Sequence, residues 1–219
     1  AMGPPAFVAA LSLLGTSFGQ TPPAPSSQGR AIDIFEELKS TLAKAKSFQA
    51  TFEVNMLGET ERYTVRFLRK NYAKILSKSS AVFQNGKVFY DYSPLDNEYW
   101  QKPAPAEGLP AGTAFSLGGL VGFEGLGFPN EPKLEPIRVK TQKWEGKSVV
   151  ALDLQSPTDP ALKATLFLDS ASKLPTGWTY TLRTYKSSGR IHDLKLNAPM
   201  KRSEFAWSPP KGAKRIATH

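Results

Sequence analysis

Few side chains in this sequence could carry out catalytic chemistry. The chain has no cysteine, and its two histidines are His192 and His219. Without a thiolate, it has no cysteine nucleophile, zinc–thiolate site or iron–sulfur centre. Acid–base chemistry would depend on carboxylates and lysines, because histidine is the side chain that ordinarily titrates near neutral pH. These residues favour a binding protein over an enzyme, and we expect neither a metal nor a cofactor.

Two motifs lack the surroundings that catalysis requires. The glycine-rich segment at residues 118–122 has neither the lysine nor the preceding strand of a phosphate-binding loop. Residues 187–189, Ser-Ser-Gly, lie close to His192 and Asp193, but nothing places a serine on a sharp strand-to-helix turn. Hydrolase chemistry is therefore disfavoured.

Charged side chains are spread along the chain. The 28 Lys and Arg residues outnumber the 19 Asp and Glu residues and give a formal charge of +9. Such a charge favours contact with anionic lipid headgroups or with nucleic acid phosphates. No basic arm or helix concentrates it, which indicates a solvated outer face. Asp91, Asp96 and Glu98 lack the spacing of a calcium loop, so we interpret them as solvated hairpin carboxylates.

The N-terminal residues have the pattern of a secretory signal peptide. Residues 6–14 form an apolar run, and small residues follow up to Gly19. The run is too short for a bilayer core of about 30 Å, so we expect no permanent membrane anchor. A flexible apolar tail is the alternative. We expect a signal peptide at residues 1–19, truncated at its start, a Pro- and Ser-rich linker at 20–29, and one exported domain at 30–219.

Residue spacing in this domain predicts one helix followed by about a dozen strands. At residues 30–47, apolar side chains recur three and four residues apart (Ile32, Phe35, Leu38, Leu42 and Ala45), which indicates a helix. From Phe48 the period changes to two, which is typical of strands with one buried face. Strands are expected at residues 48–56, 63–68, 72–77, 81–84, 87–92, 97–102, 137–143, 148–155, 164–169, 177–185, 190–196 and 205–207.

Consecutive strands joined by short turns predict one large antiparallel sheet, strongly curved or nearly closed. Asn85-Gly86 favours a hairpin with a type I′ turn, and a second turn is expected at Glu145-Gly146. Residues 148–154 are apolar at nearly every position, so we expect this strand to be covered on both faces, with the helix as one cover. Most aromatic residues fall in the apolar phase of their strands, so we expect no nucleic-acid partner.

Residues 115–128, FSLGGLVGFEGLGF, fit neither a strand nor a helix. The segment carries one charge, Glu124, and five glycines that make a rigid helix costly, at about 1 kcal/mol each relative to alanine. A movable lid is one interpretation, and a loop packed in the core is the other. The expected lid residues are Phe115, Leu117, Leu120, Val121, Phe123, Leu126 and Phe128.

Five segments together resemble the LolA family of periplasmic lipoprotein carriers and its outer-membrane lipoprotein-sorting relatives. They occur in the family's order and extend over residues 34–216. They are FEELKSTLAKAKSFQATFEV, RFLRKNYAKI, FQNGKVFYDYSP, LFLDSASKLPTGW and FAWSPPKGAKRI. Each segment is weakly specific alone, and their order gives the resemblance its weight.

This resemblance implies a mainly β fold with α: an incomplete, convex antiparallel β-barrel of about 11 strands, whose open side is closed by helices. It also implies a periplasmic location and an apolar cavity for acyl chains. In the family an arginine on an early strand holds the lid closed, and Arg69 is the matching position. The proline that usually follows is Lys70 here. The expected cavity residues are Phe48, Phe52, Val54, Met56, Tyr63, Val65, Phe67, Trp178 and Tyr180.

The function implied is that of a carrier for the acyl chains of lipoproteins or phospholipids. It would act as a monomer, shuttling cargo from an inner-membrane donor protein to an outer-membrane acceptor. The alternative is a sensor or regulatory module of the same fold that binds a membrane-protein partner without transport. An enzyme on this fold would need a carboxylate cluster inside the cavity, and the sequence offers no convincing one.

Overall fold

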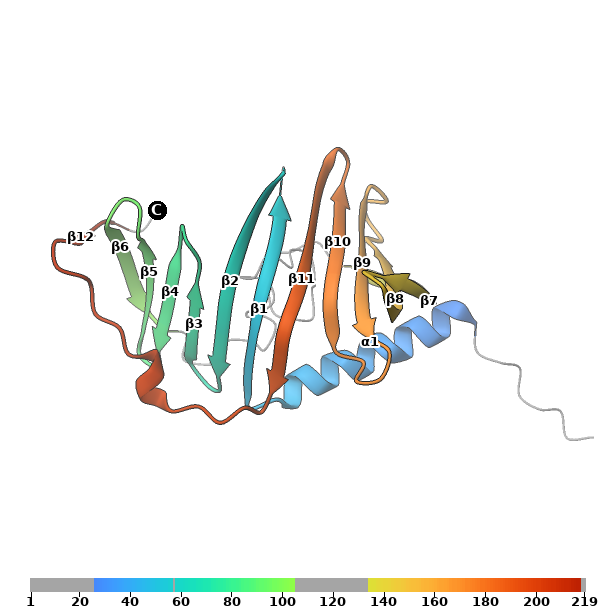
Figure 1. Ribbon diagram of the computed structural model, residues 1–219, viewed down its shortest axis with the longest axis horizontal. Coiled ribbons are helices and arrows are strands. Elements are labelled where there is room, and N and C mark those ends of the chain that lie inside the picture. The colour runs from blue at the N-terminus through green and yellow to red at the C-terminus, as the bar shows by residue number, and fades with distance from the viewer. Residues whose placement is uncertain (1–25, 57, 105–133, 218–219) are drawn as a thin grey trace, which may run out of the picture.

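The computed structural model describes residues 26–56, 58–104 and 134–217, with the side chain of Met56 left out. Most of this chain forms one 12-stranded sheet in the order β12-β6-β5-β4-β3-β2-β1-β11-β10-β9-β8-β7 (Figure 1). All neighbouring strands are antiparallel except β12 and β6, which are parallel. The mainly β, open and curved architecture expected from the sequence is confirmed.

Eleven of the twelve strands correspond to segments predicted from alternation. The strands are β1 (Ser47–Met56), β2 (Glu59–Leu68), β3 (Tyr72–Leu76), β4 (Ala81–Asn85), β5 (Val88–Ser93), β6 (Glu98–Pro103), β7 (Glu135–Trp144), β8 (Lys147–Gln155), β9 (Leu162–Asp169), β10 (Pro175–Leu182), β11 (Tyr185–Leu196) and β12 (Lys214–Arg215).

The helix α1 (Ser27–Lys44) begins and ends three residues earlier than predicted. Ser26 caps its start, because the Ser26 hydroxyl accepts a hydrogen bond of 3.0 Å from the backbone N–H of Gly29. The buried face consists of Ala31, Phe35, Leu38 and Leu42. Ile32, which we expected on this face, is 43% exposed. Ile32 is one residue after Ala31, so its side chain is rotated by about 100° around the helix axis from the buried face.

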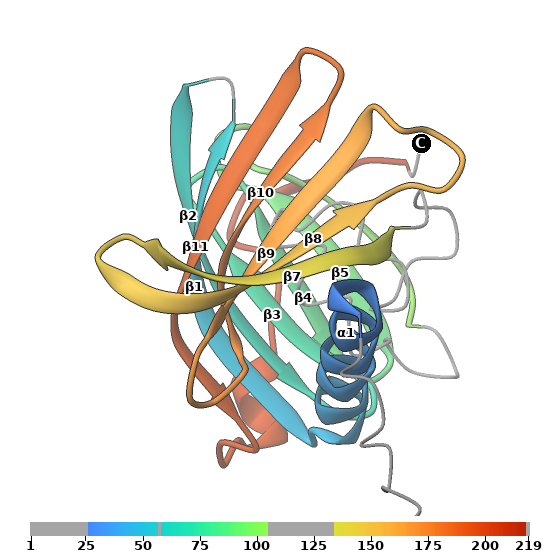
Figure 2. The same ribbon diagram turned by 90° about the vertical axis from the view of Figure 1, so that its right-hand side faces the viewer.

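The sheet curves around one side of α1 (Figure 2). The helix packs mainly against β7 and, to a lesser extent, β8, near one edge of the sheet. Its buried side chains join those of the concave face in one apolar core. We call the concave face the inner face and the convex one the outer face.

Strand β8 is buried on both faces, as predicted. Val150 and Leu152 face the core beneath the helix. On the outer face, Val149 and Ala151 form a second cluster with Phe167 and Trp144. The Trp144 and Phe167 rings stack with centroids 4.7 Å apart. The outer cover of β8 is thus a tryptophan from its own hairpin.

The two predicted hairpin turns differ in conformation. Glu145 and Gly146 have φ of 51° and 79°, so both occupy the left-handed region that a type I′ turn requires. At the β4–β5 hairpin, Gly86 has φ of 91°, but Asn85 is not left-handed. The type I′ assignment there is wrong. The Asn85 side-chain oxygen instead accepts hydrogen bonds from the backbone N–H groups of Lys87 and Val88, at 3.2 and 3.0 Å.

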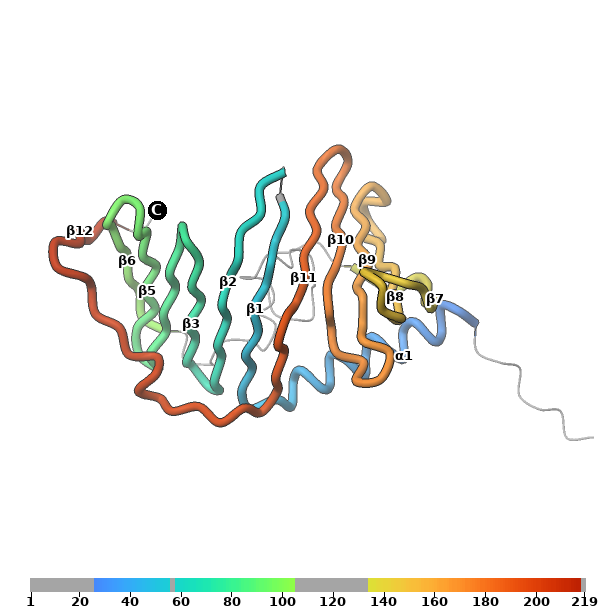
Figure 3. Tube along the Cα trace, in the orientation of Figure 1, coloured from blue at the N-terminus to red at the C-terminus, as the bar shows by residue number. Residues whose placement is uncertain are grey.

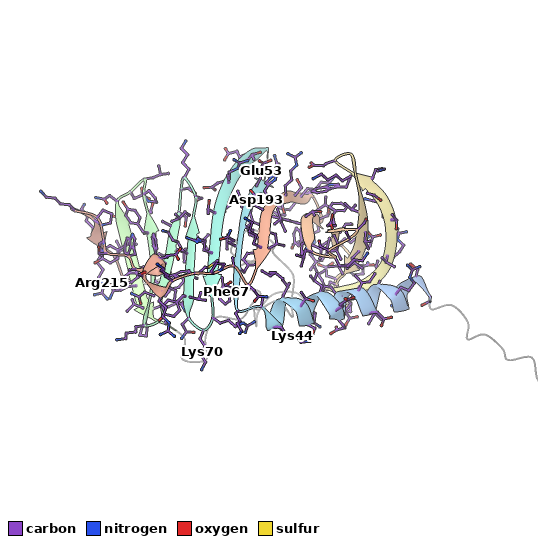
Figure 4. The ribbon with its side chains drawn as sticks, turned by 60° about the horizontal axis from the view of Figure 1, so that its bottom comes forward. Lys44, Glu53, Phe67, Lys70, Asp193 and Arg215 are labelled. Carbon is purple, nitrogen blue, oxygen red and sulfur yellow. The ribbon has the colours of Figure 1, made fainter. Side chains whose placement is uncertain are left out.

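The prediction of a strand at residues 205–207 is also wrong. A 3₁₀ helix, η1 (Arg202–Phe205), occupies the start of this segment. Its aromatic side chains pack on the sheet instead of pairing with it: Phe205 contacts Tyr72, and Trp207 stacks on Phe83 with centroids 5.1 Å apart. Figure 3 traces the chain from β11 along the sheet to β12, and Figure 4 places Arg215 at the end farthest from α1.

Candidate functional site

The inner face of β1 and β2 is apolar because both strands alternate in phase. Phe48 lies opposite Phe67, and Phe52 lies opposite Tyr63. Val54 completes the inner set on β1. All of these side chains are buried except Tyr63, which is half-buried. The two central strands therefore contribute a continuous apolar surface.

The same surface continues across β11 and β10. Phe52 lies opposite Ile191, and the Phe52 ring meets the Trp178 ring edge-on, with centroids 6.1 Å apart. Trp178 is paired with Gly189. A Cβ atom on Gly189 would overlap the Trp178 ring, so this position requires glycine for the ring to lie flat on the sheet. Tyr180 is the next inner side chain on β10.

Eight of the nine predicted cavity residues can be placed, and they share one face. These are Phe48, Phe52, Val54, Tyr63, Val65, Phe67, Trp178 and Tyr180. Met56 lies on the same strand, but its side chain is outside the description, and the seven expected lid residues also lie outside the described ranges. The roles of lining and lid stay predictions.

The inner apolar face also extends over β3 and β4, which we had not included. Val65 lies opposite Ile75, and Ile75 lies opposite Val82. All three side chains belong to the core, and Phe89 on β5 packs against it. The signal was present in the sequence, because the apolar positions of β3 alternate with more polar ones, as is typical of a half-buried strand.

A cavity of about 690 Å³ opens where the β1–β2 hairpin meets the β3–β4 and β5–β6 turns. This is within the range of about 300–1,000 Å³ typical of small-molecule sites. Val54 lines it from the inner face, and Leu95, which is 72% exposed, lines it from the β5–β6 turn. The apolar inner face thus reaches an opening at the rim of the sheet.

Hydrogen bonds to Glu61 hold this rim together. Its carboxylate accepts hydrogen bonds from the Tyr63 hydroxyl, at 2.7 Å, and from the Ser79 hydroxyl. Burial alone would raise the pKa of Glu61, but the bonds from Ser79, Ser77 and Tyr63 outweigh it and lower that pKa to about 2. Burial and the nearby Glu61 raise the pKa of Tyr63 to about 12. The network ties β2 to the β3–β4 turn.

Arg69, the expected lid latch, lies at the C-terminal end of α1. Its guanidinium donates hydrogen bonds to the carbonyl oxygens of Ala45 at 2.7 Å and Leu42 at 3.3 Å, and to that of Ala43. The last carbonyls of a helix carry partial negative charge and lack partners within the helix. Arg69 therefore joins the β2–β3 connection to α1 among the described residues, and its action on the lid stays a prediction.

The outer face carries polar pairs, and it does not bring the Ser-Ser-Gly segment against His192. Arg190 binds Glu53 at 3.0 Å and also Glu145. Ser187 is on the inner face, whereas His192 lies opposite Thr51 on the outer face. Ser188 shares the outer face with His192 but lies four residues away along β11, about 13 Å at 3.3 Å per residue, so neither serine is brought to the histidine. Within residues 26–56, 58–104 and 134–217, no three His, Asp or Glu side chains form a group that could hold a metal ion.

Neither a family model nor a curated protein sequence matches this chain. Solved structures do. An uncharacterized conserved protein from Thermus thermophilus has a TM-score of 0.56 and 13% identity, over 85% of this chain and 98% of its own. MucB has a TM-score of 0.50 and 14% identity, over 82% of this chain and 63% of its own.

A LolA superfamily protein from Nitrosomonas europaea is also a structural neighbour, with a TM-score of 0.34 and 12% identity, over 84% of this chain and 99% of its own. The two likenesses at TM-scores of 0.50 and above, with the observed sheet and helix, place the chain in the LolA-like fold. At such identities the likeness shows the fold alone. No helix within the described part of the chain is long and apolar enough to span a membrane.

Proposed function

We propose that the protein is a periplasmic carrier that binds acyl chains of lipoproteins or lipids against the inner face of its sheet. The observation that supports this proposal is the extent of that face. It runs from Trp178 on β10 to Val82 on β4, whereas α1 packs mainly against β7 and β8 at one edge. The apolar surface is thus wider than the helix that packs against part of it.

The physical reason for such a carrier is the cost of moving an acyl chain through water. Removing each CH₂ group from water is worth about 0.8 kcal/mol, so an unaided lipid leaves a membrane slowly. An apolar face shielded by a movable cover lowers this cost. In the proposal, residues 115–128 provide the cover, and the cargo passes from an inner-membrane donor protein to an outer-membrane acceptor.

A second candidate function follows from the likeness to MucB. MucB is a structural neighbour at a TM-score of 0.50, and it has been crystallised in complex with MucA. By that analogy the chain would be a regulatory module that binds a membrane-protein partner through its sheet. The outer-face side chains Glu53, Arg190 and Glu145 would supply charged contacts for such a partner.

Lipid extraction tests the first candidate most simply. Protein purified without detergent should yield co-purified acyl lipid by mass spectrometry. Lipid-free protein with a tight protein partner would favour the second candidate.

Paired substitutions locate the binding face. Phe67→Trp fills space on the inner face and should weaken binding of a fluorescent fatty acyl probe at least tenfold, and Phe67→Glu should abolish it. Phe167→Trp makes the same change on the outer face and should leave the affinity within twofold. Thermal unfolding establishes that each variant is folded. Unchanged binding in folded Phe67→Trp would overturn the cavity assignment.

A further inference from the structure

The inner face ends at β4–β6 in a group of polar side chains. Gln84 on β4 is paired with Phe89 on β5, and Asp91 on β5 is paired with Trp100 on β6. Val82, which belongs to the apolar core, is paired with Asp91. Since side chains two residues apart share a face, Gln84, Asp91 and Trp100 all lie on the inner face. Asp91 is half-buried there, so its interpretation as a solvated hairpin carboxylate is wrong.

Gln84 is the unusual member of this group. It is 0% exposed, yet neither its amide nitrogen nor its amide oxygen has a hydrogen-bond partner among the groups that the structure describes. Leaving a buried donor and a buried acceptor unsatisfied costs about 1–3 kcal/mol each, and native proteins rarely tolerate it without a reason. The amide N–H and the amide oxygen of Gln84 are therefore available to a ligand that offers an acceptor and a donor.

The surroundings of Gln84 provide a second polar group and an apolar wall. Asp91 is a diagonal neighbour of Gln84 across β4 and β5, at a backbone separation of about 7–8 Å that long side chains can bridge. The Trp100 indole N–H donates a hydrogen bond to the Asp91 carboxyl. The Phe89 and Trp100 rings pack with centroids 5.3 Å apart, and the Lys102 ammonium lies 5.1 Å from the Phe89 centroid.

These charges restrict what the group can bind. An anion would be repelled by the Asp91 carboxylate, and a cation would be repelled by the Lys102 ammonium. Burial raises the pKa of the Asp91 carboxyl, and the hydrogen bond from Trp100 offsets part of this effect. A neutral, dipolar group that both donates and accepts hydrogen bonds is compatible with Gln84, Asp91 and Lys102 together.

We propose that Gln84 and Asp91 form a polar subsite at the end of the inner face, which binds the neutral polar end of an acyl ligand, an amide or a glycerol hydroxyl. The Gln84 amide nitrogen donates to the ligand oxygen, while the Gln84 oxygen and the Asp91 carboxyl accept from its N–H or O–H. The acyl chain continues along Val82 and Ile75. This inference depends on the proposed function, because it places the polar end of the same ligand.

Displacement of a fluorescent acyl probe by three ligands of equal chain length tests the subsite. Oleamide and monooleoylglycerol carry a donor and an acceptor, whereas methyl oleate carries acceptors alone. The wild-type protein should bind the first two more tightly than the third. Gln84→Leu should weaken the first two about five- to tenfold, because the bonds that the Gln84 amide donates and accepts are both lost, and should weaken methyl oleate by a smaller factor, because it loses only the donated bond.

Controls separate this role from a structural one. Gln101→Leu makes the same change on the outer face of β6 and should alter no affinity. Gln84→Leu also replaces an unsatisfied buried amide by an apolar group of similar shape, so its melting temperature should be unchanged or higher. Gln84→Met serves as a second variant if the leucine variant does not fold.

Each outcome decides between the two proposals. Equal weakening of all three ligands, or no weakening of any, overturns the subsite while acyl binding stands. Failure of the wild-type protein to bind the probe or any of the three ligands overturns the proposed function, and the subsite with it. A loss confined to oleamide identifies the amide as the ligand, and a loss confined to monooleoylglycerol identifies the hydroxyl.

Discussion

The two ends of the sheet are built differently. From β7 to β9, apolar side chains are buried on both faces, with α1 packed against β7 and β8 on the inner face and Trp144 on the outer face. From β3 to β6, Phe205 and Trp207 of the C-terminal segment pack on aromatic rings of the outer face. The inner face there lies away from the strands that α1 mainly contacts, and it includes Gln84, whose amide has no partner among the described groups.

This difference separates a scaffold region, β7–β9 with α1, from a candidate ligand region, β1–β6, and β10 and β11 lie between them. In the scaffold region each apolar surface meets another from the same chain, as in an ordinary protein core. The candidate ligand region combines a buried apolar face, a rim cavity of about 690 Å³ and a polar group at its end. Substitutions in the scaffold region should therefore change stability alone, whereas those in the ligand region should change ligand binding.

The largest expected effect on stability is in the scaffold region. Phe35→Ala removes a buried ring from α1 and should lower the free energy of unfolding by about 3–5 kcal/mol. Urea unfolding measures this, and the affinity of the folded protein for an acyl probe should not change. Ile32→Ala, on the exposed side of the same helix, should cost no more than about 0.5 kcal/mol. Weakened probe binding by folded Phe35→Ala would contradict the division into two regions.

Next in size is the effect of Glu61 at the rim of the ligand region. Glu61→Gln should lower stability at neutral pH by about 1.5–3 kcal/mol, because hydrogen bonds to a charged group are lost. Since the pKa of Glu61 falls from 4.5 in the unfolded chain to about 2 in the folded one, its contribution is complete above pH 4.5. The contribution is lost as the pH falls toward about 2.

The comparison of acid unfolding curves tests this linkage. The Glu61→Gln variant should lose less stability than the wild type between pH 4.5 and 2. Glu59→Gln, an exposed carboxylate on the same strand, provides the control. Parallel curves for Glu61→Gln and the wild type would rule out the depressed pKa.

Gly189 is a point where the two regions meet, and its substitution has a smaller expected effect. Gly189→Ala introduces a Cβ atom that overlaps the Trp178 ring, and overpacking of this kind costs about 1–3 kcal/mol. The melting temperature and the indole fluorescence should both shift. Ser188→Ala, the neighbour on the outer face, should change neither. A normal melting temperature for Gly189→Ala would mean that the ring has room to move.

The smallest effect is expected at the start of the scaffold helix. Ser26→Ala removes the cap on the Gly29 N–H and should cost about 0.5–2 kcal/mol. Denaturant unfolding measures the loss, while Ser26→Asp should retain most of the stability because aspartate also caps. A loss of acyl binding in Ser26→Ala would show that α1 takes part in the ligand region.

Sequence reasoning predicted the helix and eleven strands because their periods of 3.6 and 2 are imposed by a single buried face. It failed where contacts from distant parts of the chain decide. The segment at residues 205–207 alternates like a strand, but Phe205 and Trp207 pack on aromatic rings of β3–β6. Ile32 was assigned to the buried helix face from its spacing, but it lies one residue out of phase with that face. Asn85 was assigned to a type I′ turn from the pair Asn-Gly, but its side-chain hydrogen bond forms a different turn.

The candidate site was predictable in part for the same reason. Alternation places Phe52 and Phe67 on one face, and pairing of β1 with β2 brings that face together. The role of Gln84 was not predictable. In the sequence, Gln84 is an ordinary polar residue in an apolar strand. Its complete burial without partners among the described groups is visible only in the structure.

Photo-crosslinking with a diazirine-labelled fatty acid, followed by peptide mass spectrometry, tests the central claim most directly. The account predicts adducts on inner-face residues of β1–β4, such as Phe67 and Ile75, and none on the outer-face cluster of Trp144 and Phe167. Adducts on the outer face, or no saturable labelling of the inner face, would contradict it.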